Sequence, residues 1–354
     1  MKRHTLSLLA LVLTFALTMP SASYAQDTNT AASISYNGFF DAYYIKNSTG
    51  PASGANKIRV FDPADNEFNL ALGEVDFLKK ADPVGFRVDI GTGRVAGLSL
   101  TGLIQQAYMT IVVPIGAGLT VDVGQFVTHM GYEVIESKDN WNYSRSILFG
   151  WAIPFYHTGA RLSYPVLSNL TATVSVLNGW NSVADNNNFK TLGLMLSYAV
   201  LPSTGITVCG ISGVEQTEPS IVGKRNVVNL IITHNLTDNL SLALDADYGE
   251  ERLPLGLATW KGEAVYGKYV LDPKSAVAVR YEMYNDGSDF SPLSTGASKL
   301  SELTATYEYK PYDNLILRGE VRNDMSDKAF FDGTSAPGTE KSQLTFLVGA
   351  IVTF

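Results

Sequence analysis

The sequence lacks the features that most often stabilise a secreted soluble domain. Cys209 is the single cysteine among 354 residues, so no internal disulfide can form. The four histidines are scattered, and none has a partner at the spacing of a zinc site. No G-x-S-x-G motif marks a nucleophilic serine. These absences exclude a disulfide scaffold and a zinc module and argue against a hydrolase. We expect no cofactor.

A long hydrophobic run occurs only at the N-terminus. The apolar run Leu6–Met19 follows a basic start and precedes Ser23-Tyr24-Ala25, which has the small-residue pattern of a signal-peptide cleavage site. We therefore expect a signal peptide over residues 1–25 and a single exported domain over residues 26–354, with a retained N-terminal anchor as the alternative. The exported part has no segment approaching the roughly 18 apolar residues of a membrane-spanning helix. If it enters a membrane, it does so as a closed barrel.

What the exported part does contain is a repeated strand pattern. Segments of roughly ten residues alternate apolar and polar side chains and end at turn residues, as membrane strands do. The segments lie near 33–45, 67–79, 84–92, 103–113, 119–128, 155–164, 170–178, 190–199, 205–214, 225–235, 240–249, 258–270, 275–285, 300–309, 314–323 and 342–354. They predict about 16 strands. The alternation breaks in 67–79 and in 119–128, where a β-bulge would shift the register.

The connections between these segments alternate in length. Every second one is short and turn-like, as at Asp272-Pro273-Lys274, and the intervening ones are longer and polar, as at Met130–Pro154. Short periplasmic turns and long extracellular loops are typical of outer-membrane barrels. We therefore predict an all-β fold, a transmembrane antiparallel β-barrel. A soluble β-sandwich has strands with the same alternation and is the alternative.

Charged side chains of both signs fall on one face of the later strands. In the segment 275–285, Arg280 and Glu282 are predicted to face inward, between apolar residues that face lipid. A water-filled lumen explains charges of both signs along the inner face of a closed barrel. Aromatic residues near strand ends are expected to form two girdles at the membrane surfaces. The expected outer girdle contains Trp151, Trp180 and Trp260.

Four strings in the middle of the chain carry a family resemblance. They are Gly124-Gln-Phe-Val-Thr128, Gly131-Tyr-Glu-Val-Ile-Glu-Ser-Lys-Asp-Asn-Trp-Asn-Tyr-Ser-Arg-Ser146, Ile153-Pro-Phe-Tyr-His-Thr-Gly-Ala-Arg161 and Leu177-Asn-Gly-Trp-Asn181. In these strings the chain resembles the putative β-barrel porin 2 family of bacterial outer-membrane proteins. The resemblance implies a porin-like barrel and leaves the transported solute undefined.

The third long connection, Met130–Pro154, is rich in residues that both pack and hydrogen-bond. In large diffusion porins the third loop commonly folds into the lumen, so we expect this loop to form the constriction. The alternative is that its charges pair with one another and hold the loop's shape. The candidate pore-lining residues are Glu133, Glu136, Lys138, Asp139, Trp141, Tyr143, Arg145, His157, Arg161, Arg280, Glu282, Arg318, Glu320 and Arg322.

Two other motifs are set aside. The string Gly91–Ala96 matches the loose G-x-G-x-x-G/A dinucleotide pattern but lacks the βαβ context that the fingerprint needs. The string Asp245–Glu250 faintly resembles a calcium loop without the ligand spacing of an EF-hand. His157 is expected to face the lumen or pack against a loop rather than to catalyse.

The expected function is passive diffusion of small hydrophilic solutes through a water-filled outer-membrane channel. The rivals are a solute-specific channel for a sugar or an anion, a membrane-embedded hydrolase, and an adhesin-like barrel with a closed lumen. Expected partners are the lipid bilayer and lipopolysaccharide, the solutes, and the barrel assembly machinery that would recognise the terminal Phe354. A homo-oligomer is left open, and no nucleic acid is expected.

The charge of the chain bears on ion preference. Removing residues 1–25 raises the excess of acidic over basic groups from eight to about ten. Loop carboxylates beyond a Debye length, about 8 Å at physiological salt, are screened from a passing ion, so the balance at the narrowest point decides. There Glu136 and Asp139 outnumber Arg145, and we expect a modest cation preference.

Overall fold

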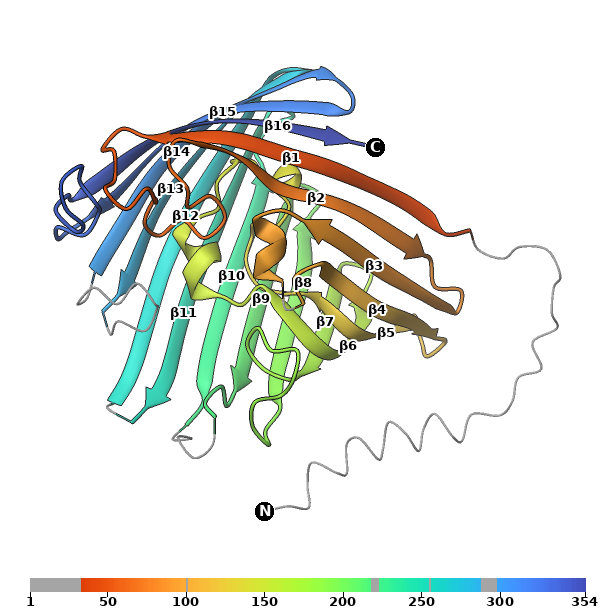
Figure 1. Ribbon diagram of the computed structural model, residues 1–354. Coiled ribbons are helices and arrows are strands. Elements are labelled where there is room, and N and C mark those ends of the chain that lie inside the picture. The colour runs from red at the N-terminus through yellow and green to blue at the C-terminus, as the bar shows by residue number, and fades with distance from the viewer. Residues whose placement is uncertain (1–32, 100, 218–222, 255, 288–297) are drawn as a thin grey trace. The chain divides into compact units, whose positions relative to one another are not determined.

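A computed structural model describes residues 33–99, 101–217, 223–254, 256–287 and 298–354, and within them the chain forms a closed antiparallel barrel of 16 strands (Figure 1). Each strand pairs with its sequence neighbours, and β1 pairs with β16 to close the sheet. The predicted strand number and fold class are confirmed.

The strands match the predicted segments closely. Their bounds are β1 Ser35–Asn47, β2 Glu67–Lys79, β3 Val84–Thr92, β4 Ile104–Val113, β5 Leu119–Val127, β6 Tyr156–Leu167, β7 Leu170–Leu177, β8 Thr191–Leu201, β9 Thr204–Gly213, β10 Arg225–Asn235, β11 Leu240–Leu253, β12 Gly256–Asp272, β13 Ser275–Asp286, β14 Ser298–Tyr312, β15 Leu315–Ser326 and β16 Ser342–Thr353. The match reflects the two-residue period, which places one face toward lipid and the other toward the lumen.

The connections alternate between short turns and longer loops along the barrel, as expected, except between β11 and β12, where only two residues separate the strands. Only two residues separate β6 from β7, whereas 28 residues, 128–155, separate β5 from β6. Three short helical elements lie in the long loops, namely η1 Val95–Leu98, η2 Ser137–Asp139 and η3 Leu148–Ala152. Among the described residues, no helix is long and apolar enough to cross a membrane.

One of the two suspected bulges is present. The pairing of β1 with β2 shifts between Asp41 and Ala42, because Ala71 is an extra residue in β2. Ala71 and Leu72 are adjacent and both buried. From Leu72 onward every second side chain points inward again, so Glu74 and Asp76 face the lumen. The pairing of β5 with β4 and β6 continues without a shift. The broken alternation in β5 therefore does not reflect a bulge.

The tryptophans do not form the expected outer girdle. Trp260 is 1% exposed, lies on the inward face of β12 and donates its indole N–H to the carbonyl of Ala152 at 3.0 Å. Trp151 donates to the carbonyl of Ile58 at 3.1 Å. The Trp180 ring stacks under the guanidinium of Arg225. For Trp151 and Trp260 the expectation was wrong because their indole N–H groups bind loop carbonyls, which are acceptors that lipid does not offer.

Candidate pore constriction

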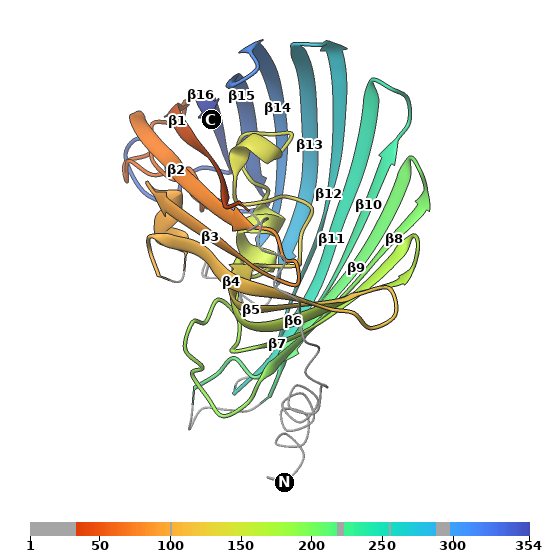
Figure 2. The same cartoon turned by 90° about the vertical axis from the view of Figure 1, so that its right-hand side faces the viewer.

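Loop 3, residues 128–155, folds into the barrel. Figures 1 and 2 show its yellow-green helical turns inside the ring of strands, and η3 contacts the inward faces of β11 and β12. A loop inside the lumen buries backbone N–H and C=O groups, and each of these needs a partner. Inward side chains of β11, β13 and β15 supply many of those partners.

Wall carboxylates accept hydrogen bonds from the N–H groups of loop 3. Glu320 on β15 accepts from Tyr143 N at 2.7 Å and from Ser144 N at 3.1 Å. Glu282 on β13 accepts from Ile147 N at 2.7 Å. Such charge-assisted bonds are about twice as strong as neutral ones, so they hold the loop backbone firmly.

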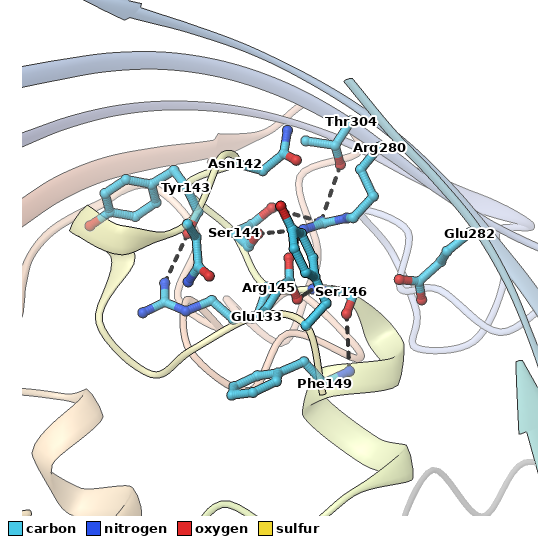
Figure 3. Close-up of polar contacts among 12 residues, drawn as sticks. Glu133, Asn142, Tyr143, Ser144, Arg145, Ser146, Phe149, Arg280, Glu282 and Thr304 are labelled. Carbon is cyan, nitrogen blue, oxygen red and sulfur yellow. Dashed lines mark hydrogen bonds and ion pairs between the residues drawn. The ribbon is translucent and has the colours of Figure 1, made fainter. Parts of the chain in front are cut away.

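Wall guanidinium groups donate to loop carbonyls in the same region. Arg280 donates to Ser144 O at 2.7 Å, as Figure 3 shows, and also binds Glu133 at 2.6 Å and Glu302 at 2.5 Å. The other two arginines donate from β15: Arg318 to Asn140 O at 2.7 Å, and Arg322 to Arg145 O at 2.5 Å. We call the inward face of β13–β15 the anchor wall.

The anchor wall contains five of the candidate pore-lining residues. All five face inward, as the alternation predicted, yet none is more than 4% exposed; they are Arg280, Glu282, Arg318, Glu320 and Arg322. Their charges are used in ion pairs and in bonds to loop 3, so they meet little water. On this side of the lumen the structure therefore agrees with the alternative, in which the charges pair with one another and hold the shape of the loop.

Three loop candidates are buried with them. Glu133 pairs with Arg280 and accepts from Ser146 N at 2.6 Å. The Tyr143 hydroxyl donates to Asp41 on β1 at 2.6 Å. Arg145 donates to Tyr143 O at 2.8 Å and lies 4.7 Å over the ring of Phe61, which belongs to loop 1, residues 48–66. Arg145, which was counted with Glu136 and Asp139 at the narrowest point, is therefore bonded within the loop and only 7% exposed.

The accessible candidates of loop 3 are at its tip, residues 136–139. Asp139 is exposed, whereas Glu136 and Lys138 are half-buried. Lys138 pairs with Asp139 at 2.5 Å and lies 5.3 Å over the ring of Phe39 on β1. Trp141, next to the tip, is half-buried and packs edge-on against Tyr132 at 5.5 Å.

The tip lies against β1 and toward β2. The Ser137 hydroxyl donates to Asp41 on β1. Glu136 and Lys138 are near enough to Glu74 and Asp76 on β2 for their charges to interact. Burial raises the pKa of Glu136 above its ordinary value of 4.5, opposed by a backbone hydrogen bond and by the cations of Lys138 and Arg87. The tip therefore presents an acid group that protonates more readily than an exposed glutamate.

The last two candidates lie on β6. Arg161 is half-buried, donates to Asp122 on β5 at 2.8 Å and lies 4.5 Å over the ring of Phe126. His157 is completely buried, with one ring nitrogen 3.2 Å from Thr128 Oγ1. Arg161 is accessible to solvent in the lumen, and His157 packs at the base of loop 3.

Several residues that shape this site were missed by sequence reasoning. Asp41 and Asn142 hold loop 3, the latter by donating to Thr306 Oγ1 at 2.8 Å. Glu74, Asp76 and Asp89 form a buried carboxylate cluster on β2 and β3. The extra residue Ala71 breaks the alternation of β2, so the sequence did not show which side chains of β2 face the lumen. A register allowing one extra residue would have placed Glu74 and Asp76 inward.

A closed barrel of 16 antiparallel strands with an inward-folded third long loop defines the porin class of outer-membrane channel. The chain belongs to the family described as putative beta-barrel porin-2, OmpL-like, whose family model matches residues 33–354. It is thus an outer-membrane porin, and the resemblance seen in its central strings is confirmed. A search of curated proteins finds no match.

Solved structures share the fold at low sequence identity. The anion-selective porin from Comamonas acidovorans is 12% identical with a TM-score of 0.64, over 91% of this chain and 99% of that one. The outer membrane channel DcaP of Acinetobacter baumannii is 15% identical with a TM-score of 0.60, over 91% and 97%. The in-vitro folded OmpT of Vibrio cholerae, in a trimer form, is 11% identical with a TM-score of 0.58, over 91% and 99%.

Proposed function

We propose that the channel is narrowest between the tip of loop 3 and the inward faces of β2–β6. The observation that carries this proposal is that the accessible charged side chains of loop 3 are all at its tip. Buried ion pairs and hydrogen bonds fasten the loop to the anchor wall, and Arg318 also holds the backbone of the tip at Ser137 O. The side chains of Glu136, Lys138 and Asp139 are nevertheless half-buried or exposed. Solutes then pass the tip and not the buried arginines.

The proposed constriction is acidic on balance. The tip supplies Glu136 and Asp139 against Lys138, and the facing strands add the carboxylate cluster against Arg87. A ring of carboxylates favours cations in a pore, and a narrow passage brings the ion within a Debye length of them. The expected selectivity is a modest preference for cations that weakens with salt.

The double variant Glu136→Gln, Asp139→Asn is expected to reduce this preference. Reversal potentials across a potassium chloride gradient measure it, at low and at high salt. The matched control is Asp185→Asn, which removes a carboxylate from the β7–β8 loop, where it pairs with Lys190 at 2.5 Å. An anion preference in the unmodified protein would show that Arg161 and Arg87 dominate the passage.

The raised pKa of Glu136 gives the selectivity a pH dependence. As pH falls from 7, Glu136 takes up a proton at a pH above 4.5, before exposed carboxylates do, and the cation preference starts to fall there. The measurement is the reversal potential as a function of pH. In Glu136→Gln this early part of the decline should shrink. An identical pH profile in the variant would remove Glu136 from the constriction.

We also propose that residues 1–25 are a cleaved signal peptide and that residues 26–354 form the mature barrel. N-terminal sequencing of protein from the outer-membrane fraction is expected to begin at Gln26, because Ser23-Tyr24-Ala25 has the pattern of a cleavage site. A sequence beginning at Met1 would indicate a retained anchor. The proposed partners are lipopolysaccharide, the assembly machinery and further copies of the chain.

A further inference from the structure

The carboxylate cluster on β2 and β3 brings three acids together inside the barrel. Asp76 and Asp89 are directly paired residues of the two strands, and Glu74 lies one inward position along β2. One oxygen from each carboxylate lies within 4.8 Å of the others. Three like charges at this separation repel one another strongly unless positive charge balances them.

The positive charge around the cluster is not sufficient. Arg87 binds Asp89 at 2.8 Å and reaches Asp76 only at 3.9 Å. Gln106, which is neutral, donates to Asp89 at 2.6 Å. One guanidinium therefore faces three carboxylates, and it bonds mainly to Asp89. The tip of loop 3 brings Lys138 toward Asp76 but also Glu136 toward Glu74, so it adds no net positive charge.

Two oxygens of the cluster have no partner among the described residues. Glu74 is 2% exposed and Asp76 is 8% exposed, yet Glu74 Oε2 and Asp76 Oδ1 accept no hydrogen bond. A buried carboxylate oxygen without a partner is costly, so it indicates a missing cation or proton. The unpartnered oxygens belong to the two acids that Arg87 neutralises least.

The donor set favours calcium over magnesium. Calcium accepts several carboxylates in irregular arrangements, whereas magnesium needs a regular octahedron, usually keeps several waters and takes only one or two carboxylates. Glu74, Asp76 and Asp89 offer three carboxylates whose positions are fixed by two neighbouring strands, which suits the more tolerant ion.

We propose that Glu74, Asp76 and Asp89 bind one calcium ion inside the channel, beside Glu136 at the tip of loop 3. Waters from the lumen complete the coordination. The bound ion neutralises part of the acidic passage, so calcium weakens the cation preference. This consequence rests on the proposed constriction, whereas the binding itself requires only the folded barrel.

Equilibrium dialysis of the detergent-folded protein against labelled calcium at pH 7 tests the binding. We expect one ion per chain, and at least a tenfold weaker affinity in Glu74→Gln, Asp76→Asn. The control Asp185→Asn removes a carboxylate that lies outside both the cluster and the tip of loop 3, and should bind as the unmodified protein does. No calcium on the unmodified protein, or equal binding by the double variant, would overturn the site in favour of shared protons.

Three further measurements separate loss of the calcium site from loss of folding or of the channel. Heat-dependent migration in detergent gels shows whether each variant is folded, and calcium should raise the melting temperature of the unmodified protein but not that of the double variant. In planar bilayers, calcium should lower the cation preference of the unmodified channel only. Calcium binding by a protein that conducts no ions would overturn the proposed channel constriction and support the site.

Discussion

Replacing residues 133–146 by a short glycine–serine linker is expected to at least double the single-channel conductance and to admit larger neutral polymers. Loop 3 occupies lumen space beside the anchor wall, and pore size depends on the narrowest cross-section. Removing the loop also leaves the anchor wall, which carries carboxylates as well as arginines, facing water. With charges of both signs along a wider passage, the shortened channel is expected to discriminate less between cations and anions.

The matched control shortens the β7–β8 loop by removing residues 183–188, part of the connection between Leu177 and Thr191. This segment contains mostly exposed or half-buried residues and is expected to leave conductance and polymer exclusion unchanged. Conductance in the presence of graded polyethylene glycols measures both properties. An unchanged exclusion size after loop 3 is shortened would mean that the loop does not limit the pore.

The substitution Arg280→Gln is expected to destabilise the barrel by about 3–5 kcal/mol, the usual cost of removing one partner from a buried ion pair. Arg280 is 0% exposed and binds both Glu133 and Glu302, as well as Ser144 O. Without the guanidinium, buried Glu133 loses its counter-charge, Glu302 keeps only Arg322 at 3.4 Å, and loop 3 loses an anchor. Urea unfolding in lipid vesicles measures the free energy, and the single-channel trace should become noisier as the loop moves.

Two variants calibrate that result. Lys190→Gln breaks the exposed pair with Asp185 and should cost no more than about 1 kcal/mol. Arg280→Lys keeps the charge but cannot make the forked contacts, so an intermediate loss is expected. If Arg280→Gln has the same free energy of unfolding as the unmodified protein and its single-channel current is no noisier, the anchor wall does not hold the loop.

The sequence was sufficient to predict the strands because each strand faces two different solvents. Lipid selects Val279 and Tyr281 on one face of β13, and the lumen selects Arg280 and Glu282 on the other. A period of two residues is readable without any knowledge of distant contacts. The alternation of turns and loops was predicted separately, from the lengths of the connections.

The role of the inward charged side chains could not be predicted from this two-residue period. Alternation places Arg280, Arg318 and Arg322 inside, but it does not say whether water or loop 3 meets them there. That depends on how deeply a loop of 28 residues folds, which long-range hydrogen bonds decide. Similarly, the extra residue Ala71 obscured the inward position of Glu74. Sequence reasoning therefore identified the loop and its wall but assigned too many of their charges to the open pore.

Single-channel recording of the purified full-length protein in a planar bilayer tests the central claim most directly. The account predicts discrete, stable conductance steps and a reversal potential that favours cations modestly at low salt. Addition of neutral polymers small enough to enter should reduce the step size, and larger ones should not. A folded barrel that inserts into the bilayer without conducting would contradict the account and favour a closed, adhesin-like barrel.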